Sequence, residues 1–249
     1  MSITQPQVPK AGDRLNSAGK IVGNKILLSI PDAEFQLICP HLEFLDLPGH
    51  LSLHEPNQKQ LFVHFLNRGL ASIVVSMRGE RDVEAGVVGS EGAVGTALAV
   101  GLDRSPLRVI MQIEGHGFRI AARALQATLQ ATPELQMRMS RYAVLQGMQV
   151  AQTAACNRLH EVQQRLARWL LMAHDRVGTR SLPITHDFLA TMLGTDRPSV
   201  SLAAGILQRD KAIEYGRAAV NVLDREKLEM SACECYRVVQ NLNGQLGLK

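Results

Sequence analysis

Cysteine and histidine have the strongest metal-binding and redox chemistry of any side chains, and this chain has four cysteines and eight histidines. The cysteines are Cys39, Cys156, Cys233 and Cys235. No pair has the Cys-x-x-Cys spacing of a zinc ribbon, and their scatter argues against a disulfide framework. Cys233 and Cys235 could bind a soft metal or be oxidised, but two thiols do not complete a four-ligand site. We therefore expect reduced, structural thiols and no metal site.

Four of the histidines lie close together in the sequence, at His41, His50, His54 and His64. Imidazole is a common metal ligand, so their geometry decides whether they form a site. His50 and His54 fall in a segment with strand character, where residues four apart share a face but lie ~13 Å from each other. We expect these histidines to be exposed or hydrogen-bonded rather than bound to a metal.

Basic and hydroxyl side chains gather at the start of a predicted helix within residues 183–207. The first half of this region has apolar residues at helical spacing after Thr185, a good N-cap. Gly194 can end that helix in the left-handed conformation, and Asp196 can cap the next one, which tolerates Pro198 in its first turn. The second helix is expected to bury Val200, Ala203, Ala204 and Leu207, and to expose Arg197, Ser199, Ser201 and Leu202 near its N-terminus. In a helix-turn-helix, that end contacts the edges of DNA bases.

Residues 212–224 alternate apolar and polar side chains on either side of Gly216-Arg217, which predicts a two-stranded hairpin. A pair of helices alone is also typical of a packed helical hairpin without DNA-binding function. A β-hairpin directly after the second helix is instead typical of a winged helix. Arg217, at the tip, could contact a DNA phosphate or remain a solvated turn residue.

The stretch from Asn157 to Asp224 resembles the C-terminal winged-helix domain of the Crp/Fnr family of transcription regulators. The resemblance rests on Arg165-Leu-Ala-Arg-Trp-Leu-Leu, Leu182-Pro-Ile-Thr, Met192-Leu-Gly, Arg197-Pro-Ser-Val and Tyr215-Gly-Arg. It implies a DNA-binding domain over residues 157–230, followed by a C-terminal tail over 231–249. It also implies duplex DNA and RNA polymerase as partners.

The resemblance implies roles for single residues as well. Arg197 matches a family arginine that contacts guanine, and a bidentate contact of this kind gives ~1–3 kcal/mol of discrimination between bases. Thr185 and Ser199 are candidates for phosphate contacts. Pro198 and Leu202 stand where the best-known members have glutamate and a second arginine. We therefore do not expect the half-site of those members here.

Short alternating runs between residues 42 and 120 predict many closely spaced strands, and so a β-sandwich or roll. Turn residues separate these runs at 67–69, 78–80 and 89–90, and flanking helices are expected at 26–37 and 121–129. Leu47-Pro-Gly-His-Leu and the run from Leu61 to Gly69 resemble the opening of the family's cyclic-nucleotide-binding domain. We expect an α+β chain whose residues 21–132 form a double-stranded β-helix, a jelly-roll-like β-roll, after a flexible N-terminus over residues 1–20.

Relatives that bind a cyclic nucleotide hold its ribose and phosphate with a Gly-Glu turn and an Arg-Ser or Arg-Thr pair. Glu91, Arg104 and Ser105 match part of this set, although the interval between them is longer. Val150 and Ala151 stand where cyclic-AMP binders carry hydroxyl residues, and each unpaired polar group costs roughly 1–3 kcal/mol. Cyclic AMP is therefore disfavoured. The β-roll either binds another small molecule through these residues or serves as a dimer scaffold.

A helix of about six turns is predicted over residues 133–156, because the segment has no internal proline and many helix formers. Small or apolar residues recur along it at Met139, Ala143, Gly147, Val150 and Ala154. Such a stripe packs on the chain's own β-roll or on a partner helix. The resemblance implies a homodimer that presents two recognition helices ~34 Å apart to a palindromic site. A break at Cys156-Asn157 is expected to precede the next helix, residues 158–174, with Leu159 and Trp169 in its core.

The composition is that of an ordinary globular protein, with 46% hydrophobic residues and a net charge of +4. No stretch approaches the ~20 apolar residues of a membrane helix, and residues 1–20 lack a signal-peptide core, so we expect a cytoplasmic protein. The positive charge favours an anionic partner only weakly. No catalytic constellation or cofactor site emerges. The interpretation is a homodimeric DNA-binding regulator; the competing hypotheses are a small-molecule or cyclic-nucleotide sensor signalling through the roll, and a dimeric interaction scaffold.

Overall fold

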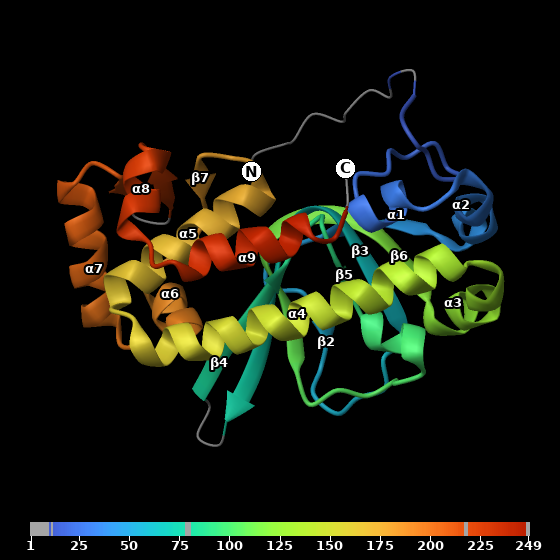
Figure 1. Ribbon diagram of the computed structural model, residues 1–249, viewed down its shortest axis with the longest axis horizontal. Coiled ribbons are helices and arrows are strands. Elements are labelled where there is room, and N and C mark those ends of the chain that lie inside the picture. Colours follow the sequence, from blue (N-terminus) through green and yellow to red (C-terminus); the bar gives the residue numbers. More distant parts are fainter. Residues whose placement is uncertain (1–9, 11, 78–80, 217–218, 248–249) are drawn as a thin grey trace.

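The computed structural model describes residues 10, 12–77, 81–216 and 219–247. A β-roll occupies one part of the molecule, a helical domain with a small sheet occupies the other, and one long helix runs past both (Figure 1). This mixed architecture is the predicted α+β fold class.

The sheet of the β-roll is antiparallel and has the strand order β1-β6-β3-β4, with β2 also paired to β6 and β5 to β3. Its strands are β1 (Glu43–Leu47), β2 (Ser52–His54), β3 (Phe62–Met77), β4 (Arg81–Val88), β5 (Ala93–Val94) and β6 (Arg108–Ala121). The turn expected at 89–90 connects β4 to β5, and the turn expected at 78–80 lies outside the described residues.

Strand β3 continues through residues 67–69, where the sequence pattern predicted a turn. The register against β6 shifts repeatedly at this point, which marks a bulge that bends the strand without ending it. The Asn67 side chain anchors the bulge by accepting hydrogen bonds from the backbone N–H groups of residues 23–24. Gly115 makes the close approach of β6 possible, since a Cβ there would lie 1.9 Å from the carbonyl oxygen of Arg68.

Short helices flank the roll as α1 (Lys25–Ser29), α2 (Asp32–Ile38) and α3 (Ala122–Thr128). The single helix predicted over residues 26–37 is wrong. Pro31 forces extended backbone on Ile30, where ψ is 154°, and so separates α1 from α2. Helix α3 lies within the predicted segment, and a 3-10 turn follows it at Leu129–Ala131.

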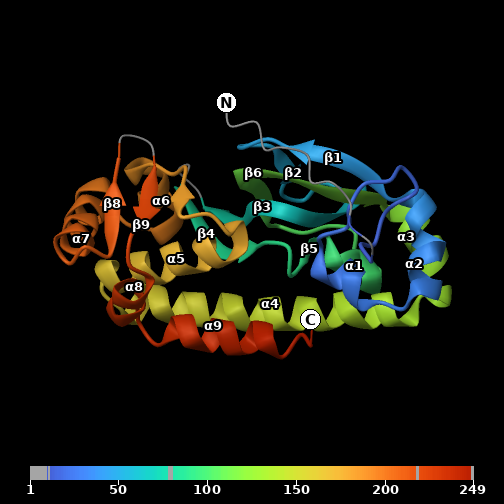
Figure 2. The same ribbon diagram turned by 90° about the horizontal axis from the view of Figure 1, so that it is seen from above.

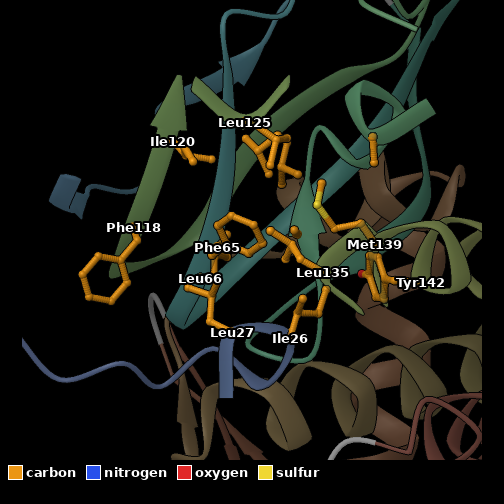
Figure 3. Close-up of a cluster of buried hydrophobic side chains, with 14 of the residues drawn as sticks. Ile26, Leu27, Phe65, Leu66, Phe118, Ile120, Leu125, Leu135, Met139 and Tyr142 are labelled. Atoms are coloured by element: carbon orange, nitrogen blue, oxygen red, sulfur yellow. The ribbon is translucent and has the colours of Figure 1, made fainter. Parts of the chain in front are cut away.

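The core of the roll forms where α1 and the long helix α4 (Pro133–Leu159) close over the sheet (Figure 3). Buried side chains from all three parts meet there, and they include Ile26, Leu27, Phe65, Phe118, Leu135, Met139 and Tyr142. Burying side chains of this size contributes roughly 1.5–3 kcal/mol each. The first half of α4 is therefore part of the roll's own core.

The described part of the N-terminus differs from the flexible segment predicted over residues 1–20. Arg14 donates hydrogen bonds to the carbonyl oxygens of Leu27 and Ile30 and pairs with Asp32. Asn16 is buried, and its side-chain oxygen accepts hydrogen bonds from the backbone of the turn that follows. Residues 12–20 are thus fixed to the roll, while residues 1–9 and 11 lie outside the described chain.

The long helix α4 extends to Leu159, past the break predicted at Cys156-Asn157. It ends at His160, whose backbone is extended, and Glu161 and Gln164 then form a capping box for α5 (Val162–Val177). Leu159 is 75% exposed rather than in the core of the next helix. The capping box stabilises the start of α5 at Val162, whereas Asn157 alone does not end α4. The boundary between the two helices is shifted for this reason.

The C-terminal domain contains helices α5, α6 (His186–Leu193), α7 (Arg197–Arg209) and α8 (Arg225–Ser231), and a sheet of order β7-β9-β8. The strands are β7 (Ser181–Leu182), β8 (Ile213–Tyr215) and β9 (Val220–Val222). Helix α5 carries a wide buried face, with Trp169 in the core as predicted and Leu166 and Leu170 beside it. The hairpin β8–β9 confirms the two-stranded element expected after the second helix.

The segment predicted as a C-terminal tail contains helix α9 (Cys235–Gly244). Figures 1 and 2 show α9 lying along α4, on the side away from the sheet of the β-roll. Leu246, which follows it, is only 2% exposed and belongs to the roll core. The C-terminal segment is thus packed structure. No helix of the described residues is long and apolar enough to cross a membrane.

Candidate nucleic-acid interface

Helices α6 and α7 are joined by a tight turn whose residues act as predicted. The Thr185 hydroxyl caps α6 by accepting a hydrogen bond from the backbone N–H of Phe188. Gly194 ends α6 in the left-handed conformation with φ at 58°, and the Asp196 carboxylate caps α7 by accepting from the N–H of Ser199. Local hydrogen bonds therefore set the angle between the two helices.

The first turns of α7 expose the side chains that the sequence singled out. The inward face carries the buried residues Val200, Ala203, Ala204 and Leu207, as expected. On the outward face Arg197, Ser201 and Leu202 are exposed, and Ser199 is half-buried. The Arg197 guanidinium lies 3.5 Å from the Asp187 carboxylate in an ion pair that is exposed on both sides. An exposed pair of this kind stabilises by 1 kcal/mol or less, roughly, so Arg197 is available to a ligand.

His186 supports this surface, although the sequence pattern did not single it out. Its ring lies 3.9 Å from the Tyr215 ring on the wing, and its Nδ1 atom is 3.1 Å from the Ser201 hydroxyl. Burial and the nearby charge of Arg197 lower the pKa of His186. The imidazole thus links α6, α7 and the hairpin. Only the tertiary packing brings these three residues together, so no local signal could have identified it.

The wing carries the second part of the expected interface. The Gly216 N–H donates to the Ala219 carbonyl oxygen across the turn, and the Tyr215 hydroxyl donates to the carbonyl oxygen of Ile184. Strand β7 pairs with β9 and extends the hairpin to three strands, a feature that the sequence pattern did not predict. Arg217, the expected phosphate contact, lies outside the described residues.

Two buried carboxylates of the roll contact helix α5 of the C-terminal domain. Glu84 on β4 accepts hydrogen bonds from Ser72 and, at 2.8 Å, from the indole N–H of Trp169. Burial raises the pKa of Glu84 to about 7, against the opposing effects of these two hydrogen bonds and of nearby arginines. Glu91 pairs with the buried Arg176 at 2.8 Å. Burial alone would lower the pKa of Arg176, but the Glu91 carboxylate, Tyr142 and Asp175 together raise it above the usual value.

The three residues expected to bind an effector do not line a common cavity among the described residues. Glu91 is occupied by Arg176, and the exposed Arg104 donates to the Asn57 carbonyl oxygen. Of the three, only Ser105 lines one cavity of about 120 Å³ in the roll. Its other lining residues include His54, Gln60, Thr96 and Gln146, with no arginine or lysine from the described chain. The cavity is small beside the ~300–1,000 Å³ of typical ligand pockets.

The stripe predicted for the dimer interface is not one exposed face of α4. Met139 is fully buried in the roll core, and Ala143 and Val150 are half-buried, whereas Gly147 and Ala154 are exposed. Six exposed apolar or small residues instead follow a side of α4 that neither the roll nor α9 covers, and they are Met137, Val144, Met148, Ala151, Ala155 and Leu159. The predicted stripe is therefore rotated by roughly one residue's turn, ~100°, from the exposed one.

The four histidines considered as metal ligands form no ligand group among the described residues. His41 and His50 are exposed. His54 and His64 are buried, each with one ring nitrogen that has no hydrogen-bond partner in the described structure. Burial lowers the pKa of His64 to about 4, so the ring is neutral. Of the four histidines, these two are therefore buried, and His54 still has a hydrogen bond to the backbone of Ser105.

The geometry defines a two-domain protein with a β-roll, a long connecting helix and a winged helix-turn-helix. Residues 164–231 match the model of the Crp-like helix-turn-helix domain family. This region is therefore a Crp-like helix-turn-helix domain, and the overall fold of the chain is shared with solved structures described as members of the crp/fnr or CRP family. No curated protein matches it in sequence.

Several solved structures share the fold at low sequence identity. FixK2 from Bradyrhizobium japonicum is 11% identical with a TM-score of 0.66, and the match covers 77% of this chain and 98% of FixK2. The c-di-GMP responsive global regulator CLP of Xanthomonas campestris is 16% identical with a TM-score of 0.63, and the match covers 77% of this chain and 99% of CLP. TTHB099, a CRP-family transcriptional regulator from Thermus thermophilus, is 20% identical with a TM-score of 0.62, and the match covers 76% of this chain and 96% of TTHB099. Identities this low establish the fold alone.

Proposed function

We propose that the chain is a transcription regulator that binds a palindromic duplex DNA site as a homodimer. The observation that carries the proposal is the N-terminal turn of α7, where Arg197, Ser201 and Leu202 are exposed while the opposite face of the helix is buried. In a helix-turn-helix, this part of the second helix enters the major groove. By the same family resemblance, RNA polymerase is a further proposed partner.

The residues of the interface have different proposed roles. Arg197 donates two hydrogen bonds to a guanine, after leaving the exposed pair with Asp187 at little cost. Leu202, 67% exposed, contacts a thymine methyl group. Thr185, Ser199 and Ser201 are proposed to contact phosphate or bases, and Arg217 on the wing is proposed to contact phosphate.

The homodimer is proposed to form through α4, but with the exposed stripe in place of the predicted one. Exposed apolar residues such as Val144 and Met148 follow the helix on the side that the roll and α9 both leave open. Gly147, Ala151 and Ala155 lie on or beside the same side, and small residues allow two helices to approach closely. Two-fold pairing of α4 places two copies of α7 to contact successive major grooves.

The roll is proposed to act without cyclic AMP. The cavity in the roll is small and lacks a described guanidinium for a phosphate, and Glu91 already pairs with Arg176. A small uncharged effector held by Ser105 and its neighbours is the alternative for a sensor function. The structure supports a scaffold role for the roll, because its carboxylates bind the C-terminal domain directly.

Selection of genomic fragments with the purified protein tests the proposal, with and without candidate effectors. The wild type is expected to enrich a palindromic motif. Arg197→Ala should abolish sequence selectivity and keep the dimer, whereas Arg209→Ala, which removes the same charge from the other end of α7, should keep selectivity. Enrichment no better than random DNA under every condition would refute the regulator, and full selectivity in Arg197→Ala would refute the assigned residue.

A further inference from the structure

Three cysteines and one histidine, far apart in the sequence, meet where α4 ends and α9 begins. Cys156 lies in the last turn of α4, His160 caps its C-terminus, Cys233 follows α8, and Cys235 opens α9. One ligand atom from each residue lies within 4.8 Å of all the others. The three cysteines are buried and form a cluster separate from both hydrophobic cores.

We propose that these four residues bind one Zn²⁺ ion in a closed tetrahedral Cys₃His site. Zinc in structural sites takes four such ligands, and three sulfurs with one imidazole nitrogen are a characteristic set. A site in which all four positions are protein ligands holds the ion for structure, because no position remains for a substrate.

The distances between the ligand atoms match that geometry. Tetrahedral coordination with Zn–S near 2.3 Å and Zn–N near 2.0–2.1 Å separates two sulfurs by about 3.8 Å and a sulfur from a nitrogen by about 3.5 Å. Cys156 Sγ and Cys233 Sγ are 3.5 Å apart, and Cys235 Sγ is 3.6 Å from His160 Nδ1. These two distances therefore already fit edges of a single-ion site, and all four ligand atoms lie within 4.8 Å of one another.

The surrounding groups orient the ligands as a metal site requires. His160 Nε2 lies 3.2 Å from the Glu234 carboxylate, which holds the ring proton on Nε2 and leaves the Nδ1 lone pair facing the sulfurs. A carboxylate behind a histidine ligand is a regular feature of zinc sites. The Gln152 side-chain amide donates to Cys235 Sγ at 3.0 Å, a hydrogen bond that suits a thiolate.

Charge also favours an occupied site. Three thiolates around Zn²⁺ carry a net charge of −1, and the buried guanidiniums of Arg165 and Arg168 interact electrostatically with Cys156. The Nε atoms of both arginines have no hydrogen-bond partner among the described residues. A buried positive charge is costly without a negative charge nearby, and neutral thiols would supply no negative charge.

The ion would connect segments that local structure leaves separate. Cys156 and His160 precede the winged-helix domain, whereas Cys233 and Cys235 follow it. One bound ion therefore fixes both chain connections of that domain at a single point. This role is independent of the proposed DNA binding, so the test below needs no DNA.

Metal analysis of the full-length protein tests the proposal. Protein made in zinc-supplemented medium and dialysed is expected to retain one zinc per chain by elemental mass spectrometry. Cys233→Ala should retain none, and Cys39→Ala, the loss of a buried thiol elsewhere, should retain one. Co²⁺ added to chelated wild type under anaerobic conditions should give the thiolate charge-transfer and tetrahedral d–d absorption bands.

Two further measurements keep the test decisive if Cys233→Ala fails to fold. Zinc should protect three thiols of the wild type from alkylation, and chelation should expose them and lower its Tm. Wild-type protein that is folded yet retains neither zinc nor cobalt overturns the proposal. So does iron in place of zinc, or an intact mass of the untreated protein that shows a Cys156–Cys233 disulfide.

Discussion

Replacing Glu84 by glutamine should change how the stability of the protein depends on pH. The folded pKa of Glu84 is about 7, above the ordinary value of 4.5. Between these values the folded protein keeps the proton that the unfolded chain releases. The contribution of Glu84 to stability is therefore fully present below pH 4.5 and is lost as pH rises through 7.

The size of this effect follows from the two pKa values. A separation from 4.5 to about 7 corresponds to about 3 kcal/mol, at ~1.4 kcal/mol for each pH unit. Glutamine does not ionise and keeps an oxygen that accepts the hydrogen bond from Trp169. The free energy of unfolding of Glu84→Gln, minus that of the wild type, should thus rise by about 3 kcal/mol between pH 4.5 and about pH 8.

Urea denaturation followed by tryptophan fluorescence measures this difference, because Trp169 is the only tryptophan and contacts Glu84 directly. His64, whose pKa is lowered to about 4, contributes stability that rises with pH, but it does so equally in both proteins and cancels. Glu114→Gln, on the exposed surface, is the control and should follow the wild type. A difference between Glu84→Gln and wild type that stays constant across this pH range would refute the reasoning.

Three further predictions concern the dimer, the domain junction and the turn. Val144→Glu on the exposed stripe of α4 should convert the dimer to monomer in analytical ultracentrifugation, whereas Met230→Glu, at an even more exposed apolar residue on α8, should not. A dimeric Val144→Glu would place the interface elsewhere. Glu91→Gln should lower the free energy of unfolding by about 3 kcal/mol, because it leaves the buried Arg176 without its charged partner. Glu43→Gln, in the exposed pair with Arg119, should lower the free energy of unfolding by less than about 1 kcal/mol. Equal losses would contradict the burial argument. Gly194→Ala should destabilise the protein by about 1–2 kcal/mol, since the φ of Gly194 is 58°. Gly205→Ala within α7 should stabilise it by up to about 1 kcal/mol. Thermal unfolding should therefore show a lower Tm for the first variant and a higher Tm for the second.

The helix-turn-helix could be predicted in detail because short-range interactions determine it. Thr185, Gly194 and Asp196 act on backbone groups within a few residues, and the buried face of α7 follows directly from its periodicity. The hairpin of the wing is likewise visible in the alternation of residues 212–224. Helix boundaries are harder to predict where local signals compete. The capping box at Glu161 starts α5 at Val162, after the break expected at Asn157.

The exposed face of α4 could not be determined from its sequence. Its small residues occur on several faces, so periodicity alone does not show which one the roll covers. The packing of Met139 into the roll core and of α9 along another side leaves the face with Val144 and Met148 exposed. In the same way, Asn67 and Gly115 turn a predicted loop into a bulge through contacts with distant segments.

The sequence by itself determined the class of each domain, the helix-turn-helix and its exposed residues, because these depend on composition, periodicity and capping within a few residues. The tertiary structure alone decided which distant side chains meet. It gave Glu84 and Glu91 partners on α5, which removed Glu91 from the expected effector site. It also brought Cys156 and His160 to Cys233 and Cys235, which are more than 70 residues away in the chain. Two thiols that could not complete a metal site in the sequence thereby became half of a four-ligand set, since ligand geometry is a property of the folded chain.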